Sequence, residues 1–400
     1  MNGRFSLVAL TAANAVSLAG NVVATVAVPW FVLETTGSAA KTGIAAFFTT
    51  LPLALGGLFG GTLADRVGHR TASVTTDVVS AAAIAGVPVL YELDRLQFWH
   101  LIVLVFVTSL FDAPGQSARE ALVPRLAEDS GRSLERATSM WVSTEHVAYV
   151  VGAPLAGVLI AAVGAANVML VDAASFLAAA ALVGLFVRAV HVAPERRGRY
   201  LEELRTGVRF LIGDPVLRLF LVAASIGNML AAPIALVFLP VYANEVLASP
   251  EALGLCIAAY GVGGIAGAIL LEPIVRVLGR RRAYLLSWLI WVVVYFGIAA
   301  LPPLPIMLLV LLATALSVAA PIEALVRQER TPADLRARVF ATFMAALTLA
   351  SPIGVLAAGF VVEEVGLAAA ILGAAALNAV AAVVFVRPAA RSVQAATRAR

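Results

Sequence analysis

Residues 42–70 read TGIAAFFTTLPLALGGLFGGTLADRVGHR. The first part of this stretch, 42–64, carries no charged side chain and is long enough for a helix to cross a bilayer, which takes about 20 residues. The run ends at an acidic and a basic residue, Asp65 and Arg66, followed by Gly68. The stretch therefore predicts a transmembrane helix that ends in a charged loop.

The composition of the whole chain agrees with this prediction. Hydrophobic residues make up 61% of the 400 residues and charged residues 13%. Soluble domains carry about 45–50% and about 25% of these classes. A chain this apolar excludes an ordinary soluble enzyme, a secreted disulfide scaffold and a disordered protein. Cys256 is the single cysteine, so no disulfide forms within the chain.

The same apolar pattern recurs along the sequence, separated by turn or charge signals. We predict an all-α integral membrane protein with twelve spanning helices, at 6–33, 42–64, 72–91, 98–118, 138–163, 166–189, 216–243, 252–275, 282–301, 304–325, 338–362 and 366–387. The first span is too long for the apolar core of a signal peptide and lacks a clear cleavage site, so we expect it to be retained.

The distribution of basic residues predicts the orientation. Of the 28 Lys and Arg residues, all except Lys41 and Arg95 fall in one alternate set of loops and in the two termini. Basic residues accumulate on the cytoplasmic side of membrane proteins. We therefore expect both termini in the cytoplasm, in the inner membrane of a bacterium, and an even number of spans.

The chain also divides into two similar halves. The longest polar stretch between spans separates six spans from six, giving expected domains at 1–190 and 216–400 and a linker at 191–215 with an amphipathic helix on the cytoplasmic leaflet. A shift of about 211 residues superimposes several residues of the halves; the pairs include Pro29 and Pro240, Ser38 and Ser249, Gly56 and Gly267, Gly68 and Gly279, and, with a slightly smaller shift, Gly164 and Gly366. Parallel six-helix repeats are a known transporter design.

The loop after the second span carries a more specific pattern, formed by Gly61, Asp65, Arg66, Gly68 and Arg70. It resembles the loop signature of the major facilitator superfamily. The segments 114–124, 152–157 and 172–176 are similar to the branch of bacterial exporters for macrolides, siderophores and drugs. The resemblance implies two pseudo-symmetric six-helix bundles and alternating access. It also implies secondary active export of amphipathic small molecules, driven by protons.

The resemblance gives the signature a role as a cytoplasmic gate. It implies that Asp65 faces the N-terminal end of the eleventh span, near 334–338, and latches the two halves. The alternative is a loop charge that only sets topology. Pro154 in the fifth span predicts a helix kink, which is either a moving gate or a static bend.

Ionisable residues within spans are costly and mark functional positions. Glu145 in the fifth span is the first candidate for the proton carrier, and the other candidates are Asp77, Asp112 and Asp172. For each carboxylate except Asp172, the alternative is an ion pair with an arginine near the bundle mouth; Asp172 would alternatively fix the fifth and sixth spans. Glu272 and Arg276, one turn apart, predict a local ion pair. Asn14, Asn21 and Asn228 are the polar candidates for lining a substrate cavity.

The expected partners are therefore an amphipathic small molecule, protons and the lipid bilayer, and the chain is expected to act as a monomer. No cofactor, metal site or nucleic-acid partner is expected, and the glycine pattern at 261–266 indicates helix packing rather than dinucleotide binding. Two alternatives stay open. One is a carrier of the same fold for a lipid-like substrate or a nutrient, and the other is a membrane partner or sensor that transports nothing. An enzyme is not expected.

Overall fold

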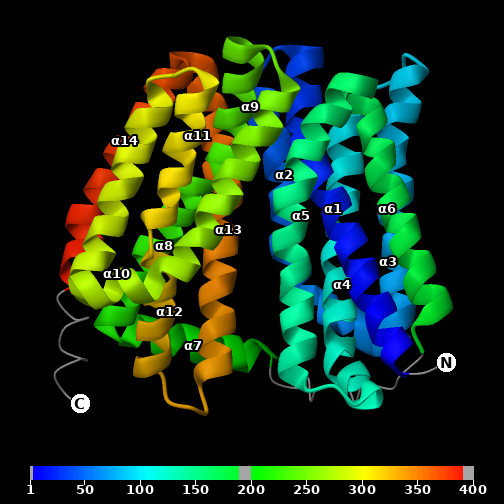
Figure 1. Ribbon diagram of the computed structural model, residues 1–400, viewed down its shortest axis with the longest axis horizontal. Coiled ribbons are helices and arrows are strands. Elements are labelled where there is room, and N and C mark those ends of the chain that lie inside the picture. The colour runs from blue at the N-terminus through cyan, green and yellow to red at the C-terminus, as the bar shows by residue number, and fades with distance from the viewer. Residues whose placement is uncertain (1–2, 189–199, 391–400) are drawn as a thin grey trace. The chain divides into compact units, whose positions relative to one another are not determined.

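The structure is a computed structural model that describes residues 3–188 and 200–390. Helices make up nearly all of this part of the chain, and no strand occurs in it. Tertiary contacts divide the chain into two units, Met1–Glu195 with Ala248–Ala258, and Arg196–Leu247 with Ala259–Arg400. Within each unit, helices pack side by side along much of their length (Figure 1).

The helices of the first half follow one another with short turns. Their bounds are α1 Gly3–Thr36, α2 Ala39–Val67, α3 His69–Glu92, α4 Phe98–Ser130, α5 Leu134–Val163 and α6 Ala165–Phe186. The second half contains α7 Tyr200–Gly213, α8 Pro215–Pro233, α9 Leu239–Tyr242, α10 Pro250–Ala299, α11 Leu304–Leu312, α12 Ala319–Arg330, α13 Arg336–Val365 and α14 Leu367–Ala381. The π-helical segments Ile234–Phe238 and Ala243–Leu247 extend the α8 and α9 path, and Ala382–Val386 extends α14.

Local geometry repeats between the halves at the positions that the sequence comparison paired. Ser38 Oγ accepts a hydrogen bond from the backbone of Lys41 at 3.2 Å, and Ser249 Oγ accepts one from Ala252 at 3.1 Å. Both serines thereby cap the start of a helix, satisfying an N–H group that has no partner within the helix. The internal repeat is therefore present in the backbone as well as in the residue types.

Ten helical segments in the described part of the chain are long and apolar enough to cross a membrane. One of them, Pro250–Ala299, has 50 residues and bends sharply at Gly279, so it contains two of the predicted spans. The predicted fifth span corresponds to α5, a helix of 30 residues. The fold class is confirmed, and we keep twelve spans as its interpretation.

The predicted span 304–325 is interrupted, which the hydropathy pattern did not reveal. Helix α11 gives way to a 3-10 turn at Ala313–Leu316, and α12 starts at Ala319. Side chains of α10 form hydrogen bonds to the residues at this break. Ser287 Oγ accepts from the backbone N–H of Val318 at 2.8 Å, and Trp291 Nε1 donates to Ser317 Oγ at 3.1 Å. Irregular backbone inside a membrane requires such internal partners.

The glycine pattern at 261–266 packs against this interrupted span. A Cβ atom added at Gly263 would lie 2.1 Å from Thr314 Oγ1, and a Cβ atom added at Gly267 would lie 2.8 Å from the carbonyl oxygen of Ser317. Glycine lets the two backbones approach this closely. The interpretation of the pattern as helix packing is confirmed.

The boundary predicted for the fourth span is wrong by more than three turns. Helix α4 does not end near 118 but continues to Ser130, where Gly131 closes it in a left-handed conformation. Arg119, which the sequence placed in a loop, is consequently inside the helix bundle and fully buried. The extension also puts Asp112 near the middle of α4 rather than near its end.

The amphipathic helix expected in the linker is α7. It packs on its own unit through Leu211, which is buried in a cluster with Leu217, Val339 and Phe343. A side chain at Gly207 would lie 2.2 Å from Thr342 Oγ1, so α7 and α13 are in direct backbone proximity. Residues 191–199 of the expected linker lie outside the described residues.

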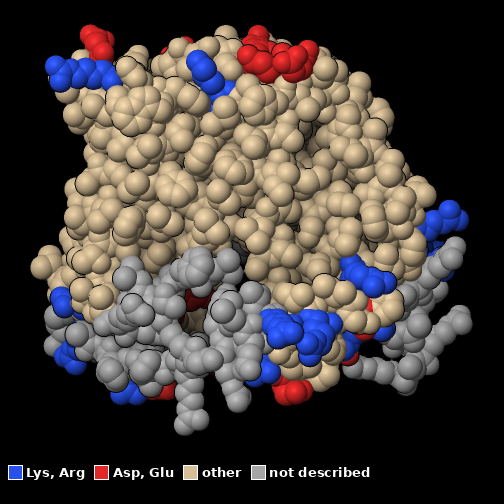
Figure 2. All heavy atoms as spheres, turned by 180° about the vertical axis from the view of Figure 1, so that it is seen from behind, with Lys and Arg blue, Asp and Glu red and all other residues tan. Residues whose placement is uncertain are grey.

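Exposed side chains follow the pattern of a protein surrounded by lipid. On the face in Figure 2, charged side chains gather at the ends of the helices, with a nearly uncharged band between them. Large apolar residues such as Ile269, Leu309 and Val383 are more than 60% exposed along the helices. Such exposed apolar surface marks a membrane contact.

Candidate functional site

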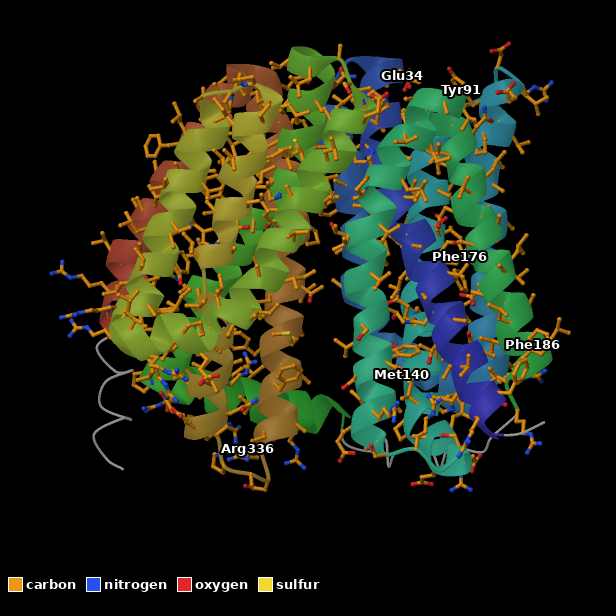
Figure 3. All side chains as sticks on the ribbon, viewed as in Figure 1. Glu34, Tyr91, Met140, Phe176, Phe186 and Arg336 are labelled. Carbon is orange, nitrogen blue, oxygen red and sulfur yellow. The ribbon has the colours of Figure 1, made fainter. Side chains whose placement is uncertain are left out.

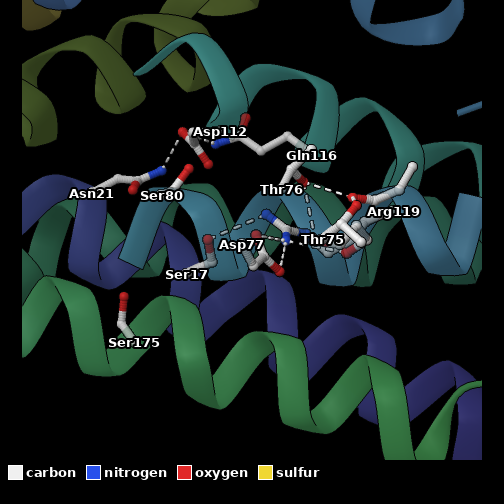
Figure 4. A network of polar contacts seen from close by, with 12 residues as sticks. Ser17, Asn21, Thr75, Thr76, Asp77, Ser80, Asp112, Gln116, Arg119 and Ser175 are labelled. Atoms are coloured by element: carbon white, nitrogen blue, oxygen red, sulfur yellow. Dashed lines mark hydrogen bonds and ion pairs between the residues drawn. The ribbon is translucent and has the colours of Figure 1, made fainter. Parts of the chain in front are cut away.

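A buried ion pair lies at the centre of the first bundle. Nη1 of Arg119 on α4 donates to both carboxylate oxygens of Asp77 on α3, at 2.8 Å to Oδ1 and 2.7 Å to Oδ2, and neither side chain is exposed. Nη2 of Arg119 donates to Ser17 Oγ of α1 at 3.2 Å. Figure 4 shows this network linking three helices. Of the carboxylates near the arginine, Asp77 is the one that pairs with it.

Asp112 occupies a different environment two turns earlier on α4. Its Oδ2 accepts from the Asn21 amide of α1 at 2.8 Å and from the Gln116 amide at 3.2 Å (Figure 4). Its Oδ1 is buried without a hydrogen-bond partner among the described residues. Asp112 does not form the ion pair with an arginine that was the alternative to its role as a proton carrier, because the guanidinium of Arg119 pairs with Asp77 and two amides donate to Asp112 instead.

Asp172 of α6 lies on the other side of α1. A side chain at Gly20 would lie 2.6 Å from Asp172 Oδ1 and 1.9 Å from Ser175 Oγ, so the α1 backbone is in close contact with both groups. Ser175 Oγ donates to the backbone carbonyl of Asp172 at 2.8 Å, and Asp172 Oδ1 is buried without a partner in the described part of the chain. Phe176, one turn further along α6, lies about midway along the helices in Figure 3.

The three carboxylates and the arginine thus form one polar cluster. We call Asp77, Asp112, Asp172 and Arg119 the acidic cluster; all four side chains are at least nine-tenths buried. Asp112 lies within electrostatic range of Arg119 and of both other carboxylates. The sequence analysis named the three carboxylates as site residues but placed Arg119 in a loop. The signal was the helical spacing of Arg119, Leu122 and Leu126 beyond the predicted end of the span, because all three are buried on one face of α4.

The remaining predicted site residues are not gathered in this cluster. Asn14 donates to Thr144 Oγ1 of α5 at 2.9 Å, and Asn228 of α8 donates to the Leu347 carbonyl and Ser351 Oγ of α13 at 2.6 and 2.7 Å. The three predicted cavity asparagines therefore each join two helices of their own unit. Helix α5 continues through Pro154. The side chains of Glu145 and His146 lie outside those that the structure describes.

The gate signature is described only in part. Gly61, Asp65 and Arg66 lie in the last turns of α2, and their side chains are outside the described set. Gly68 has φ 88° and ψ 137°, and Arg70 donates to the backbone carbonyl of Gly184 on α6. Arg70 therefore joins α3 to α6 inside the first bundle.

The second bundle buries a smaller polar group between α10 and α12. Tyr284 Oη donates to Glu323 Oε1 at 2.9 Å, and both side chains are buried. One turn further along α12, the guanidinium carbon of Arg327 lies 4.3 Å from the ring centre of Phe343 and 5.0 Å from that of Phe340. Glu272 and Arg276 form the predicted local ion pair at an exposed position.

An ion pair outside the spans joins the start of α8 to the end of α12. Asp214 accepts from the backbone N–H groups of Val216 and Leu217 at 2.8 and 3.1 Å and pairs with Arg330 at 3.0 Å. Partial burial alone would raise the pKa of Asp214, but the Leu217 N–H, Arg330 and the Val216 N–H together lower it below its ordinary value.

Comparison with known proteins adds information on the family. The model of the family described as "Transmembrane secretion effector" matches residues 5–400. The chain is 32% identical to the multidrug efflux pump Tap of Mycolicibacterium fortuitum over 362 residues, 88% of each chain. It is also 32% identical to Tap of Mycobacterium tuberculosis over 91% of this chain and 88% of the relative. It is 21% identical to macrolide efflux protein A of Streptococcus pyogenes over 91% of both.

Solved structures confirm the fold at lower identity. The nucleoside transporter NupG matches with a TM-score of 0.76 and 11% identity over 96% of this chain and 98% of that one. A bacterial homologue of the iron transporter ferroportin, in an inward-facing state, matches with a TM-score of 0.74 and 17% identity over 96% and 98%. The chain therefore belongs to the transmembrane secretion effector family of the major facilitator superfamily and is a multi-pass membrane transporter rather than an enzyme.

Proposed function

We propose that the chain is a secondary active exporter that moves amphipathic small molecules, of drug or macrolide type, out of the cell in exchange for protons. The main support is the 32% identity to multidrug efflux pumps over about nine-tenths of the chain. The substrate class follows those relatives. Alternating access of the two bundles is the mode of transport that the fold supports.

The support for proton coupling is the acidic cluster. A coupling group must exist in a charged and a neutral form, and a carboxylate buried in a membrane protein meets this requirement because burial makes its charge costly. Asp77, Asp112 and Asp172 are buried on three helices of one bundle, and Arg119 pairs with Asp77. Glu145 remains a candidate on the basis of its position in the fifth span.

The distribution of basic residues supports a bacterial inner membrane location with both termini in the cytoplasm. In the first bundle, Met140 and Phe186 lie at one end of the helices and Glu34 and Tyr91 at the other (Figure 3). Ser6 Oγ donates to the Phe186 carbonyl at this end. Two arginines of the expected cytoplasmic set also form hydrogen bonds here: Arg4 donates to the Ser130 carbonyl, and Arg132 donates to the Met140 sulfur. The expected cytoplasmic ends of the helices thus come together.

The test uses everted membrane vesicles with an imposed acid-inside pH gradient, followed with a fluorescent weak base. Erythromycin, ethidium and a siderophore are added in turn to vesicles with and without the protein. We expect at least one compound to collapse the gradient only when the protein is present, because inward drug movement releases protons. Collapse by none of them, with the protein inserted, would contradict proton-coupled drug export and favour a lipid-like or nutrient substrate.

A further inference from the structure

The acidic cluster carries an imbalance of charge. The cluster holds three carboxylates and one guanidinium, and the exposed fractions of these residues are 0% for Asp77, 5% for Asp112, 1% for Asp172 and 0% for Arg119. If all four side chains were ionised, the cluster would hold two uncompensated negative charges. An isolated charge in a dry interior is costly enough that a titratable group takes up a proton instead.

The hydrogen bonds show where the charge is compensated. Asp77 receives both Nη1 hydrogen bonds of Arg119, so its charge has a partner. Asp112 receives two amide donors at Oδ2, which stabilise an ionised carboxylate. Asp172 has no amide or guanidinium donor among the described residues: its Oδ1 is unpartnered, and the nearby Ser175 hydroxyl, which is close enough to stabilise the Asp172 charge, donates its proton to the Asp172 backbone carbonyl.

The charged groups around Asp172 increase this difference. The charge of Asp112 on α4 is close enough to repel that of Asp172. The other described charges of the cluster, Asp77 on α3 and Arg119 on α4, neutralise each other in their ion pair. Gly20, the α1 residue in close contact with Asp172, carries no charge, and neither do Ser17 and Asn21 on the same helix. Glu145 and His146 lie on α5, which also packs against α6, and their side chains are outside the described set.

The site has room for a proton but not for a drug. Asp172 is 1% exposed, and the backbone of Gly20 lies so close that an added methyl group would lie 2.6 Å from Oδ1. A molecule of drug size needs a pocket of roughly 300 Å³ or more. We infer that Asp172 binds the coupled proton at an enclosed site between α1 and α6, separate from the site that binds the transported compound.

This inference rests on the proposed proton-coupled export, and it also links the proton site at Asp172 to the site that binds the transported compound. Helix α1 touches both carboxylates, Asp172 through Gly20 and Asp112 through Asn21. A displacement of α1 when the compound binds changes the surroundings of both groups at once, and this drives release of the proton. Proton and compound are then linked through α1 and do not compete for one set of atoms.

The first experiment detects the proton directly in the purified full-length protein. Infrared spectra at neutral pH are recorded for wild type, Asp172→Asn and the exposed control Asp94→Asn. We expect the carbonyl-stretch band of one protonated carboxyl group to disappear in Asp172→Asn and to persist in the control. We also expect Asp172→Asn to fold normally, because an amide resembles a neutral carboxyl group. An unchanged band, or failure of this variant to fold, would overturn the inference.

The second experiment separates the inference from the proposed function. Gradient collapse in everted vesicles and ethidium binding to the purified protein are compared for wild type and Asp172→Asn. We expect loss of collapse with unchanged ethidium affinity. Collapse retained in the variant, or collapse and binding lost together, would overturn a separate proton site. If wild type collapses no gradient while the infrared band still depends on Asp172, the proton site stands and the proposed export fails.

Discussion

Gly68 and Gly279 adopt the same backbone conformation at equivalent positions of the two halves. Their angles are φ 88°, ψ 137° and φ 74°, ψ 152°, and each glycine turns the chain from one spanning helix directly into the next. Gly164 and Gly366 form a second such pair, with φ 80°, ψ 152° and φ 84°, ψ 161°. This region of backbone angles is nearly restricted to glycine.

The substitution Gly279→Ala should therefore lower the free energy of unfolding of the protein. Holding a side chain in this conformation costs about 1–3 kcal/mol. No other atom lies within 4 Å of an added methyl group there, so the effect would come from the backbone alone. The check is the thermal unfolding temperature in detergent. The matched control is Gly373→Ala in α14, where there is also open space and no positive φ; it should be neutral or slightly stabilising.

Removing either member of the Asp77–Arg119 pair should be strongly destabilising. A single change such as Asp77→Asn leaves a buried charge without its partner, which costs about 3–5 kcal/mol. Both side chains are fully buried, and Arg119 Nη1 lies 2.7 Å from Asp77 Oδ2. Replacing both residues, Asp77→Leu with Arg119→Met, should restore much of the loss. Unfolding measured for the two single variants and the double variant tests this, and additive losses would contradict the pairing.

The Asp214–Arg330 contact should stabilise the protein in a pH-dependent way. Because the pKa of Asp214 is lower in the folded state than its ordinary 3.8, its contribution is complete above that value and is lost as the pH falls through the folded-state pKa. Asp214→Ala should lower the stability at pH 7 by about 1 kcal/mol, as expected for loss of a helix cap. The difference between variant and wild type should vanish in strong acid. A difference independent of pH would contradict an ionic role.

Helix α7 should detach from α13 when Gly207 is replaced. A methyl group there would lie 2.2 Å from Thr342 Oγ1 and 2.8 Å from the carbonyl oxygen of Arg338. Gly207→Ala should therefore increase hydrogen exchange of the α7 amides. Gly213→Ala, at the end of the same helix with no atom within 4 Å, is the matched control. Equal exchange in both variants would show that this close contact does not hold α7.

The gate proposed from the loop signature predicts an effect on turnover rather than on folding. Asp65 lies in the last turn of α2, which ends at Val67. A carboxylate at this negative end of a helix dipole requires a cation or the N-terminal end of another helix as its partner. Asp65→Asn should lower the rate of drug-dependent gradient collapse, with membrane insertion unchanged. The measurement is the initial rate in everted vesicles at matched protein amounts. A rate equal to that of wild type would reduce Asp65 to a topology-setting charge.

The sequence by itself determined most of the membrane architecture because its signals are local. Apolar runs, the capping residues Ser38 and Ser249, and the paired glycines act over a few residues, and they recur in register between the halves. The Glu272–Arg276 pair, one turn apart on α10, could also be predicted for this reason.

Only the tertiary structure decided how the charges combine. Asp77 and Arg119 are 42 residues apart, and hydropathy placed the arginine in a loop, because one charge at the end of an apolar run looks the same whether the helix stops or continues. The Asn21 amide at Asp112 and the Gly20 backbone against Asp172 both come from α1, and Asn21 is 91 residues away from Asp112 in the sequence; the second amide at Asp112, that of Gln116, comes from α4 itself. Packing between distant segments determines which carboxylate is left without a partner, and no local sequence pattern predicts it.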